Sequence, residues 1–364
     1  MTDPATTSPL LAPYVGAGFD LPNRIAMAPM TRGRADDLTG MPHPFTPSYY
    51  ASRASAALIV TEGLYPSKVG KSGPGVPGLV THAHVRAWRE VTSAVHAAGG
   101  RIFAQLWHGG RVSHAVTVGE SGPPLAPSAV RKSGPIYTTN GWVDSVTPTA
   151  MTAVQIAGTI EEFGAAARRA IAAGFDGVEL HGANGYLIQQ FMADNTNQRS
   201  DRYGGTTANR IRFAVEVVEA VSAAVGAGRV GIRVSPGNPE NDIVETDPFG
   251  TYRMLVRELD RLDLAYLHVV ETSRDFALEQ LRPLWSSMLI ANDHSSPQPS
   301  TQADGERFVE SGHADVVAFG RAWLANPDLP GRIARGEPLR FIPRDQYYGA
   351  GEAGFSSLES AVLA

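Results

Sequence analysis

Three polar side chains able to form hydrogen bonds, His181, Asn184 and Tyr186, lie within six residues of one another. They follow the short apolar run 174–180, GFDGVEL, which is typical of a buried strand. A parallel strand delivers the groups that follow it to its carboxyl end, where α/β sheets and barrels build their sites. An imidazole and a carboxamide can hold one substrate oxygen together, and a nearby phenol can supply a proton. The spacing therefore predicts a catalytic cluster after this strand.

Other chemically useful groups lie at or near the carboxyl ends of similar runs, and a barrel would bring them to the same mouth. The Gln105 amide can both donate to and accept from an imide edge, and Arg233 is a permanent cation that can stabilise a reduced ring. Gly320 lets backbone approach a ligand, and Arg321 follows the eighth run, where barrels commonly bind phosphate. These types together predict a planar heterocycle carrying a phosphate.

Short apolar runs alternate with amphipathic stretches, which indicates βαβ units and a parallel sheet. Eight strands are predicted, at 24–29, 57–62, 101–107, 177–181, 230–235, 266–270, 288–292 and 315–320. Helices are predicted at 46–55, 82–98, 152–173, 206–225, 248–262 and 303–311. Eight such units favour a single-domain (β/α)8 TIM barrel over residues 1–364, with an open doubly wound sheet as the alternative.

Two segments depart from the alternation. Residues 108–150 are rich in Gly, Pro, Ser and Thr and contain an expected hairpin at about 128–143. A long insertion after strand 3 is typical of a functional lid or cap. The C-terminal tail, 343–364, has weak periodicity and is expected to wrap back over the barrel.

The 364-residue chain is 43% hydrophobic and 18% charged, with a net charge of −5, so it has no basic surplus for binding nucleic acid. It has no cysteine, which excludes disulfides, iron–sulfur clusters and thiolate–zinc sites and suits a reducing compartment. His108 and His114 lack partners at metal-ligand spacing, so no metal site is expected. The chain shows no leader pattern and no apolar run near ~18 residues, so we expect a cytoplasmic protein without a membrane partner.

The sequence resembles the Old Yellow Enzyme family of FMN-dependent ene-reductases from about residue 10 to about 355. The motifs that carry the resemblance are NRIAMAPMTR at 23–32, QLWH at 105–108, HGANGYLIQQF at 181–191, RSDRYGG at 199–205, AFGR at 318–321 and NPDL at 326–329. Together these motifs are highly specific.

The resemblance implies tightly bound, non-covalent FMN reduced by NADPH or NADH. It implies that Thr31 contacts the flavin C4 carbonyl, that Gln105 contacts the pyrimidine edge and that Arg233 lies beside N1 and the C2 carbonyl. The other implied cofactor contacts are Pro29, Met30, Gly63, Asn292, Gly320 and Arg321, with the last two at the phosphate. From the sequence alone, Arg233 could instead form a buried ion pair with Glu179.

The resemblance also implies the chemistry. His181 and Asn184 would bind the carbonyl or nitro oxygen of an electron-poor alkene, flavin N5 would deliver hydride to the β-carbon, and Tyr186 would protonate the α-carbon. Trp107 would serve either as core or as a wall of the substrate pocket. A homodimer is expected by analogy alone. The alternative is a flavin-binding protein without efficient turnover, a sensor or store.

Two stretches depart from the family pattern. The segment 291–301, ANDHSSPQPST, is several residues longer than usual, and its Asp293 would repel a phosphate if it pointed inward. We expect Asp293 to face solvent. Relatives often have an aromatic residue near Gly73, and without it the pocket is expected to be wider on that side.

Overall fold

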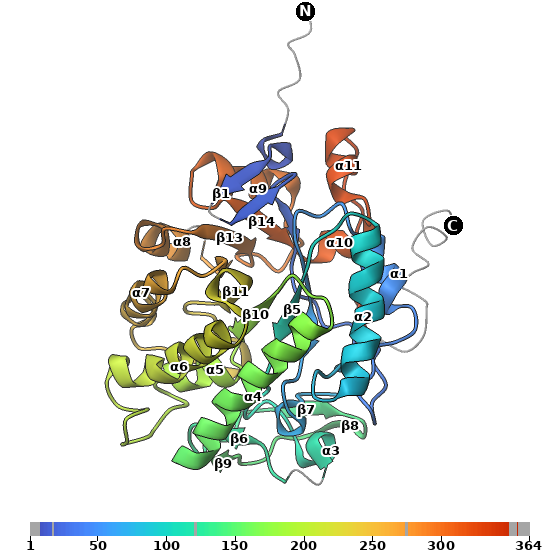
Figure 1. Ribbon diagram of the computed structural model, residues 1–364. Helices are drawn as coiled ribbons and strands as arrows, with labels where there is room; N and C mark the ends of the chain where they lie inside the picture. The colour runs from blue at the N-terminus through green and yellow to red at the C-terminus, as the bar shows by residue number, and fades with distance from the viewer. Residues whose placement is uncertain (1–7, 17, 120–121, 274–275, 349–354, 356–364) are drawn as a thin grey trace, which may run out of the picture.

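Eight parallel strands close into one barrel (Figure 1) in the computed structural model, which describes residues 8–16, 18–119, 122–273, 276–348 and 355. Their order around the barrel is β3 (Ile25–Met27), β4 (Ile59–Leu64), β5 (Ile102–Leu106), β10 (Gly177–Gly182), β11 (Val230–Val234), β12 (Tyr266–Glu271), β13 (Met288–Asp293) and β14 (Val316–Phe319). Each predicted strand overlaps one of these. The predicted TIM barrel is therefore confirmed, and the open sheet is wrong.

Helices follow the strands and surround the barrel. The longer ones are α2 (His82–Ala97), α4 (Ala153–Ala172), α6 (Thr207–Val225), α7 (Pro248–Leu259) and α9 (Gln302–Glu310), all close to their predicted bounds. The predicted helix 46–55 is shorter, because α1 ends at Ala51. Within the described residues, five further α-helices were not predicted: α3 (Ala115–Val118), α5 (Leu187–Met192), α8 (Phe276–Leu281), α10 (Arg321–Ala325) and α11 (Leu329–Ala334). Each has six residues or fewer, too few to show a helical period.

Local chemistry fixes where the long helices start. The Thr152 hydroxyl accepts a hydrogen bond from the backbone N–H of Gln155, whose side chain in turn accepts from the Thr152 N–H. Thr81 makes the corresponding capping box with His84 at the start of α2. Such caps satisfy helix N–H groups that have no partner inside the helix.

The barrel interior is built in layers, because every second residue of a strand faces the same side. Phe103 and Tyr266 fill the layer nearer the amino ends of the strands, with ring centroids 5.6 Å apart. A side chain at Gly231 would place its Cβ only 2.3 Å from the Tyr266 ring, so glycine is required there. Two residues further along the strands stand polar groups, and the candidate site lies above them.

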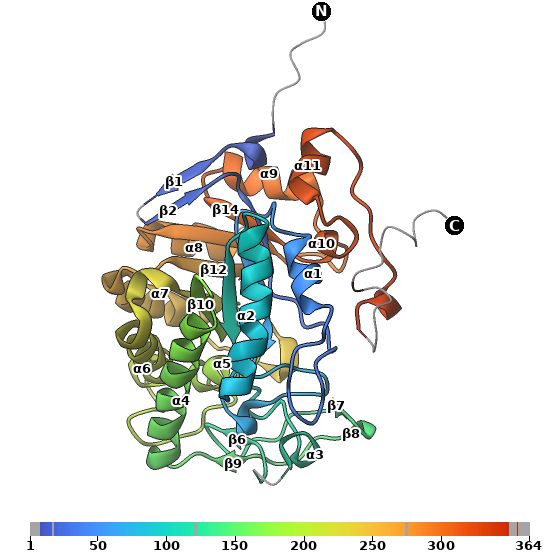
Figure 2. The same ribbon diagram turned by 45° about the vertical axis from the view of Figure 1, so that its right-hand side comes forward.

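The two ends of the barrel carry different additions (Figure 2). A hairpin of β1 (Tyr14–Gly16) and β2 (Phe19–Leu21), not predicted, lies at one end, where Leu21 packs against the apolar cluster inside the barrel. The insertion after β5 lies at the other end. It contains α3, the parallel pair β6 (Leu125–Ala126) and β9 (Thr149–Ala150), and the hairpin β7 (Pro135–Thr138) and β8 (Gly141–Asp144), shorter than the expected 128–143. Its function as a lid stays a prediction.

The described part of the C-terminal tail returns to the barrel, as expected. The Tyr347 carbonyl accepts a hydrogen bond from Arg32 Nε at 3.1 Å, and the Phe355 ring stacks on Tyr49 with centroids 4.3 Å apart. The rest of 343–364 lies outside the described residues, and the single-domain assignment over 1–364 stays a prediction. Among the helices described here, none combines the length and the apolar character that crossing a bilayer requires.

Candidate active site at the barrel mouth

A cavity of about 700 Å³ lies at the carboxyl ends of the strands. A volume of this size suits a cofactor or another small molecule. The predicted site residues that line it are Pro29, Met30, Thr31, Gln105, Trp107, His181, Asn184, Tyr186, Arg233, Asn292, Gly320 and Arg321. Residues from strands β5, β10, β11 and β13 thus meet with groups that follow β3 and β14, as the strand-end argument predicted.

Gly63 is the predicted site residue that is not part of the cavity lining. It is buried in β4, and a Cβ at this position would lie 2.3 Å from the Trp107 ring. Its observed role is to leave room for that indole. Trp107 in turn lines the cavity and packs edge-on against Tyr186, with ring centroids 4.7 Å apart.

His181 presents a neutral imidazole to the cavity. Its side chain is 7% exposed, and its Nδ1 is buried without a hydrogen-bond partner in the described part of the chain. Burial, reinforced by the positive charge of Arg233, lowers the pKa of His181 to about 3. The ring therefore carries one N–H donor and no charge at neutral pH.

Asn184 adopts the left-handed conformation, with φ of 56°, at the turn after β10. Its backbone N–H donates to Ser235 Oγ at 2.8 Å, and its carbonyl accepts from Asn241 Nδ2 at 2.9 Å. Tyr186 follows at the start of α5, and burial raises the pKa of its phenol. Asn184 is thus held on both sides of its Cα, and Tyr186 remains protonated at neutral pH.

A chain of hydrogen bonds crosses the barrel directly below the cavity. Gln105 Nε2 donates to Glu179 Oε1 at 2.8 Å, and Glu179 Oε2 is 2.8 Å from His268 Nδ1. Arg233 contacts His268 Nε2 and donates to Asn292 Oδ1 at 2.6 Å. Since a guanidinium only donates, His268 accepts at Nε2 and carries its proton on Nδ1, facing Glu179.

The charge states of the groups in this hydrogen-bond network follow from their contacts. Burial alone would raise the pKa of Glu179, but the His268 ring, the Arg233 cation and the Gln105 amide together lower it. Burial and the Arg233 charge lower the pKa of His268 to about 4, so the ring is neutral. The ion pair suggested between Arg233 and Glu179 is therefore indirect, because His268 lies between the two charged groups.

His268 was missed by the sequence reasoning, although a signal existed. It lies two residues after Tyr266 on β12, so it faces the barrel interior as that tyrosine does. The same alternation places Gln105 above Phe103. A strand that fills a barrel with an aromatic ring and then a histidine predicts an interior polar group, but not its partner.

The far end of the cavity is formed by the long loop 293–301. Arg321 donates to the backbone carbonyls of Pro297 and Gln298, at 2.6 and 2.5 Å. Asp293 does not simply face solvent as expected: it is half-buried and lines the cavity, and its Oδ1 accepts from the Ser295 N–H and hydroxyl at 2.9 and 2.7 Å. A phosphate bound here would have to share Arg321 with these carbonyls.

These residues fit a flavin. Glu179 accepts from Gln105 Nε2, so the Gln105 Oε1 is left for a cofactor N–H at the cavity floor. Arg233 supplies a cation on the same floor, and Gly320 leaves open space, because an added Cβ would meet only Met30, at an ordinary 3.6 Å. Thr31, Pro29 and Met30 would hold the remaining edge.

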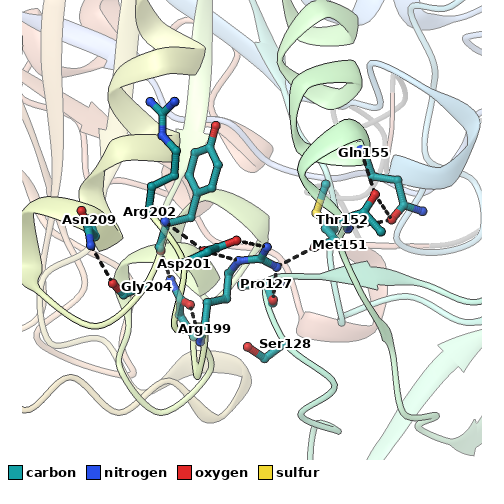
Figure 3. A network of polar contacts seen from close by, with 12 residues as sticks. Pro127, Ser128, Met151, Thr152, Gln155, Arg199, Asp201, Arg202, Gly204 and Asn209 are labelled. Carbon is teal, nitrogen blue, oxygen red and sulfur yellow. Dashed lines mark hydrogen bonds and ion pairs between the residues drawn. The ribbon is translucent and has the colours of Figure 1, made fainter.

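Arg199 of the RSDRYGG motif ties the insertion to the barrel (Figure 3). One guanidinium nitrogen donates to the carbonyls of Pro127 and Met151, at 2.8 and 2.6 Å, just beyond the two strands β6 and β9. The other two nitrogens bind the Asp201 carboxylate. A single side chain therefore joins the middle of the insertion, at Pro127, to the residue that follows it, Met151.

Arg199→Lys is expected to lower the free energy of unfolding by about 2 kcal/mol, because one ammonium cannot reach both carbonyls and the carboxylate, and charged hydrogen bonds are lost. Urea unfolding measures this. The matched control is Arg202→Lys, whose side chain is 63% exposed and pairs with Glu216; about 0.5 kcal/mol or less is expected. Equal effects of the two substitutions would contradict the stabilising role given to the Arg199 hydrogen bonds.

Acid is expected to destabilise the protein through buried neutral histidines. Burial lowers the pKa of His108 to about 4, as in His181 and His268, so below about pH 6.5 the unfolded chain binds up to three more protons. Glu62 opposes this, since burial raises its pKa to about 7 and the folded state holds one proton more. For these four groups the net difference is about two protons near pH 5.5 and about one at pH 6.5, which predicts a loss of about 2 kcal/mol in the free energy of unfolding between the two.

Urea unfolding at pH 6.5 and 5.5 measures this loss, and His108→Gln should reduce it by about 1 kcal/mol. A stability that rises as the pH falls would contradict the assignment of these histidines as neutral.

Comparison with known proteins identifies the family. The family model for the NADH:flavin oxidoreductase / NADH oxidase family matches residues 10–340. A probable flavin mononucleotide-dependent alkene reductase of Leishmania infantum is 40% identical over 358 residues, covering 95% of this chain and 96% of the relative. The 12-oxophytodienoate reductase 2 of Arabidopsis thaliana is 36% identical, covering 97% and 96%.

Solved structures agree. The Old Yellow Enzyme homologue from Zymomonas mobilis superposes with a TM-score of 0.91 at 36% identity, over 96% of this chain and 99% of the other. Morphinone reductase in complex with tetrahydroNAD gives 0.90 at 39% identity, over 96% of both chains. The resemblance read from the motifs is thereby confirmed: the chain belongs to the NADH:flavin oxidoreductase / NADH oxidase family and is an FMN-dependent oxidoreductase of the Old Yellow Enzyme type.

Proposed function

We propose that this protein uses NADPH or NADH to reduce the C=C bond of electron-poor alkenes, namely α,β-unsaturated carbonyls and nitroalkenes, and also reduces nitrate esters. The observation that carries the proposal is the presence of His181 and Asn184 in the same cavity as Gln105 and Arg233. Flavin binding alone needs neither of the first two. A group that grips a substrate oxygen beside the flavin position is what alkene reduction requires.

His181 and Asn184 bind the substrate oxygen through N–H groups. As the alkene is reduced, negative charge builds on this oxygen, so both hydrogen bonds become stronger in the transition state than in the ground state. The imidazole is neutral, so its N–H donates a hydrogen bond without adding a positive charge that would bind anions indiscriminately. Bound FMN, once reduced by the nicotinamide, supplies the hydride for the β-carbon.

Tyr186 supplies the proton for the α-carbon. Its phenol is protonated at neutral pH, because burial raises its pKa, and the Trp107 ring packs against it and limits its movement. Thr31, Gln105, Arg233 and the residues at the phosphate end are proposed to hold FMN in the roles that the resemblance implies. Gly63 is proposed to line the cofactor, as the resemblance implies, and it also leaves room for Trp107.

The test uses the colour of the purified protein. Its flavin bands should bleach anaerobically with NADPH or NADH and return when cyclohexenone is added, with cyclohexanone as the product. Cyclohexene, which lacks the oxygen, should leave the bands bleached. Bleaching without recovery by cyclohexenone would instead indicate a flavin-binding protein without turnover.

Two expectations remain proposals. A cytoplasmic location is supported by the absence of cysteine from the sequence. A homodimer rests on the resemblance. Fractionation of the native cells tests the first, and sedimentation velocity of the purified holoprotein tests the second.

A further inference from the structure

Asn238 contacts the side chain of Asn184 from the loop between β11 and α7. It is buried, at 5% exposure, and its Nδ2 is 3.0 Å from Asn184 Oδ1. Neither the sequence motifs nor the proposed chemistry assigns it a role. Its position matters because a carboxamide can face a ligand with either of two opposite ends, an oxygen that accepts or a nitrogen that donates.

A backbone group decides which end is used. The Glu240 backbone N–H is 3.1 Å from one end of the Asn238 carboxamide, and an N–H can only donate, so that end is Oδ1. The other end, Nδ2, therefore points to Asn184 and requires an acceptor there. Asn184 meets Asn238 with its Oδ1, and its own Nδ2 is left for the cavity.

The surroundings leave Asn184 only the choice between these two orientations. Ser235 Oγ accepts from its N–H and Asn241 Nδ2 donates to its carbonyl, which fixes the backbone at φ 56°. Ser235 Oγ also contacts Gln189 Oε1 at 3.1 Å, so the hydroxyl is itself held. The Asn184 side chain can then still change by rotating its carboxamide end for end, which costs little free energy by itself. The hydrogen bond from Asn238 opposes this rotation.

We propose that Asn238 is a positioning residue that fixes the Asn184 carboxamide with its N–H2 toward the substrate, so that this point of the cavity binds only atoms that accept a hydrogen bond. The proposal rests on the proposed function and refines it. Carbonyl and nitro oxygens satisfy the requirement. Groups that can only donate, such as an ammonium, are excluded. The Glu240 N–H fixes the orientation of Asn238, and Asn238 in turn directs the donor end of Asn184 to the cavity.

Asn238→Asp tests the proposal with almost no change in shape. The carboxylate has acceptors at both ends, so one oxygen keeps the Glu240 N–H and the other attracts Asn184 Nδ2, which turns the Asn184 oxygen to the cavity. The dissociation constant of cyclohexanone from oxidised holoprotein, followed by perturbation of the flavin bands, should rise about tenfold. Cyclohexanol, whose hydroxyl can donate, should change by less than about threefold.

Repeating the substitution in the Asn184→Ala variant separates the effect of the Asn184 orientation from the effect of the added negative charge. If the introduced carboxylate acts through Asn184, adding Asn238→Asp to Asn184→Ala should leave the cyclohexanone affinity unchanged within about twofold. An equal loss in both backgrounds, or an equal loss for ketone and alcohol, would overturn the proposal, because either result is what an added negative charge alone produces. Flavin content, read from the absorbance ratio, confirms that the variants are loaded.

Failure of the proposed function gives a different signature. If cyclohexenone does not reoxidise the bleached wild-type protein, the alkene-reductase assignment is wrong whatever the binding series shows. If reoxidation occurs but Asn238→Asp leaves ketone binding intact, the assignment stands and the positioning role of Asn238 is wrong.

Discussion

Replacing His181 or Asn184 with alanine is expected to slow reoxidation of the reduced flavin by cyclohexenone by a factor on the order of 10²–10³. In the proposed mechanism, each side chain supplies one of two N–H donors for the substrate oxygen, and each donor gains strength as charge builds on that oxygen. The double variant should lose less than the product of the two single losses, because both donors act on one atom.

Anaerobic stopped-flow mixing of pre-reduced protein with cyclohexenone measures the rate directly. The rate should not respond to His181 titration between about pH 6 and 8, because the pKa of this ring is held at about 3. His96→Ala is the control: its ring is 41% exposed and pairs with Asp176, away from the cavity. A loss below about threefold in both site variants would contradict the role given to these donors.

The sequence was sufficient to predict the barrel, and to predict that the residues at its strand ends share one cavity, for one physical reason. Parallel strands in a barrel end at the same mouth, so residues at strand ends such as Gln105, His181 and Asn292 converge whatever the loops between them do. A strand shows itself by a short apolar run, and all six residues of β10 are buried. Placement at the mouth therefore needs no knowledge of contacts.

The partners of these residues could not be predicted, because they depend on register and on loop paths. His268 stands between Arg233 and Glu179 since β12 is paired with β11 such that His268 lies beside Arg233. Asn238 reaches Asn184 across a loop whose course no periodicity encodes. Gly63 was assigned to the cofactor through the resemblance alone, and no strand pattern could have shown that the space beside it is taken by Trp107.

Glu179→Gln is expected to raise the midpoint potential of the bound flavin by an amount on the order of tens of millivolts. Glu179 is fully buried, and its charge offsets that of Arg233 on the cavity floor. Removing it leaves the floor one unit more positive, which favours the reduced cofactor, the form that carries more negative charge. Reductive titration against a reference dye measures the shift.

The same substitution disturbs the hydrogen-bond chain. Glutamine has one acceptor where the carboxylate offered two, so it cannot accept from both Gln105 Nε2 and His268 Nδ1. Moving the His268 proton to Nε2 would set it against an Arg233 N–H, so the less costly response is for the Gln105 amide to turn over. The free energy of unfolding should fall by about 3 kcal/mol, because a buried cation loses its counter-charge.

Glu216→Gln provides the control for charge removal alone. Glu216 pairs with Arg202 at the surface and accepts from the Tyr203 hydroxyl, so its loss should leave the flavin potential unchanged. A potential that stays constant or falls in Glu179→Gln would mean that the carboxylate below the cavity is either protonated or electrically remote from the flavin. The low pKa of Glu179 argues against protonation, and its bond to Gln105, which lines the cavity, argues against remoteness. The flavin potential is therefore expected to depend on a carboxylate that does not itself line the cavity.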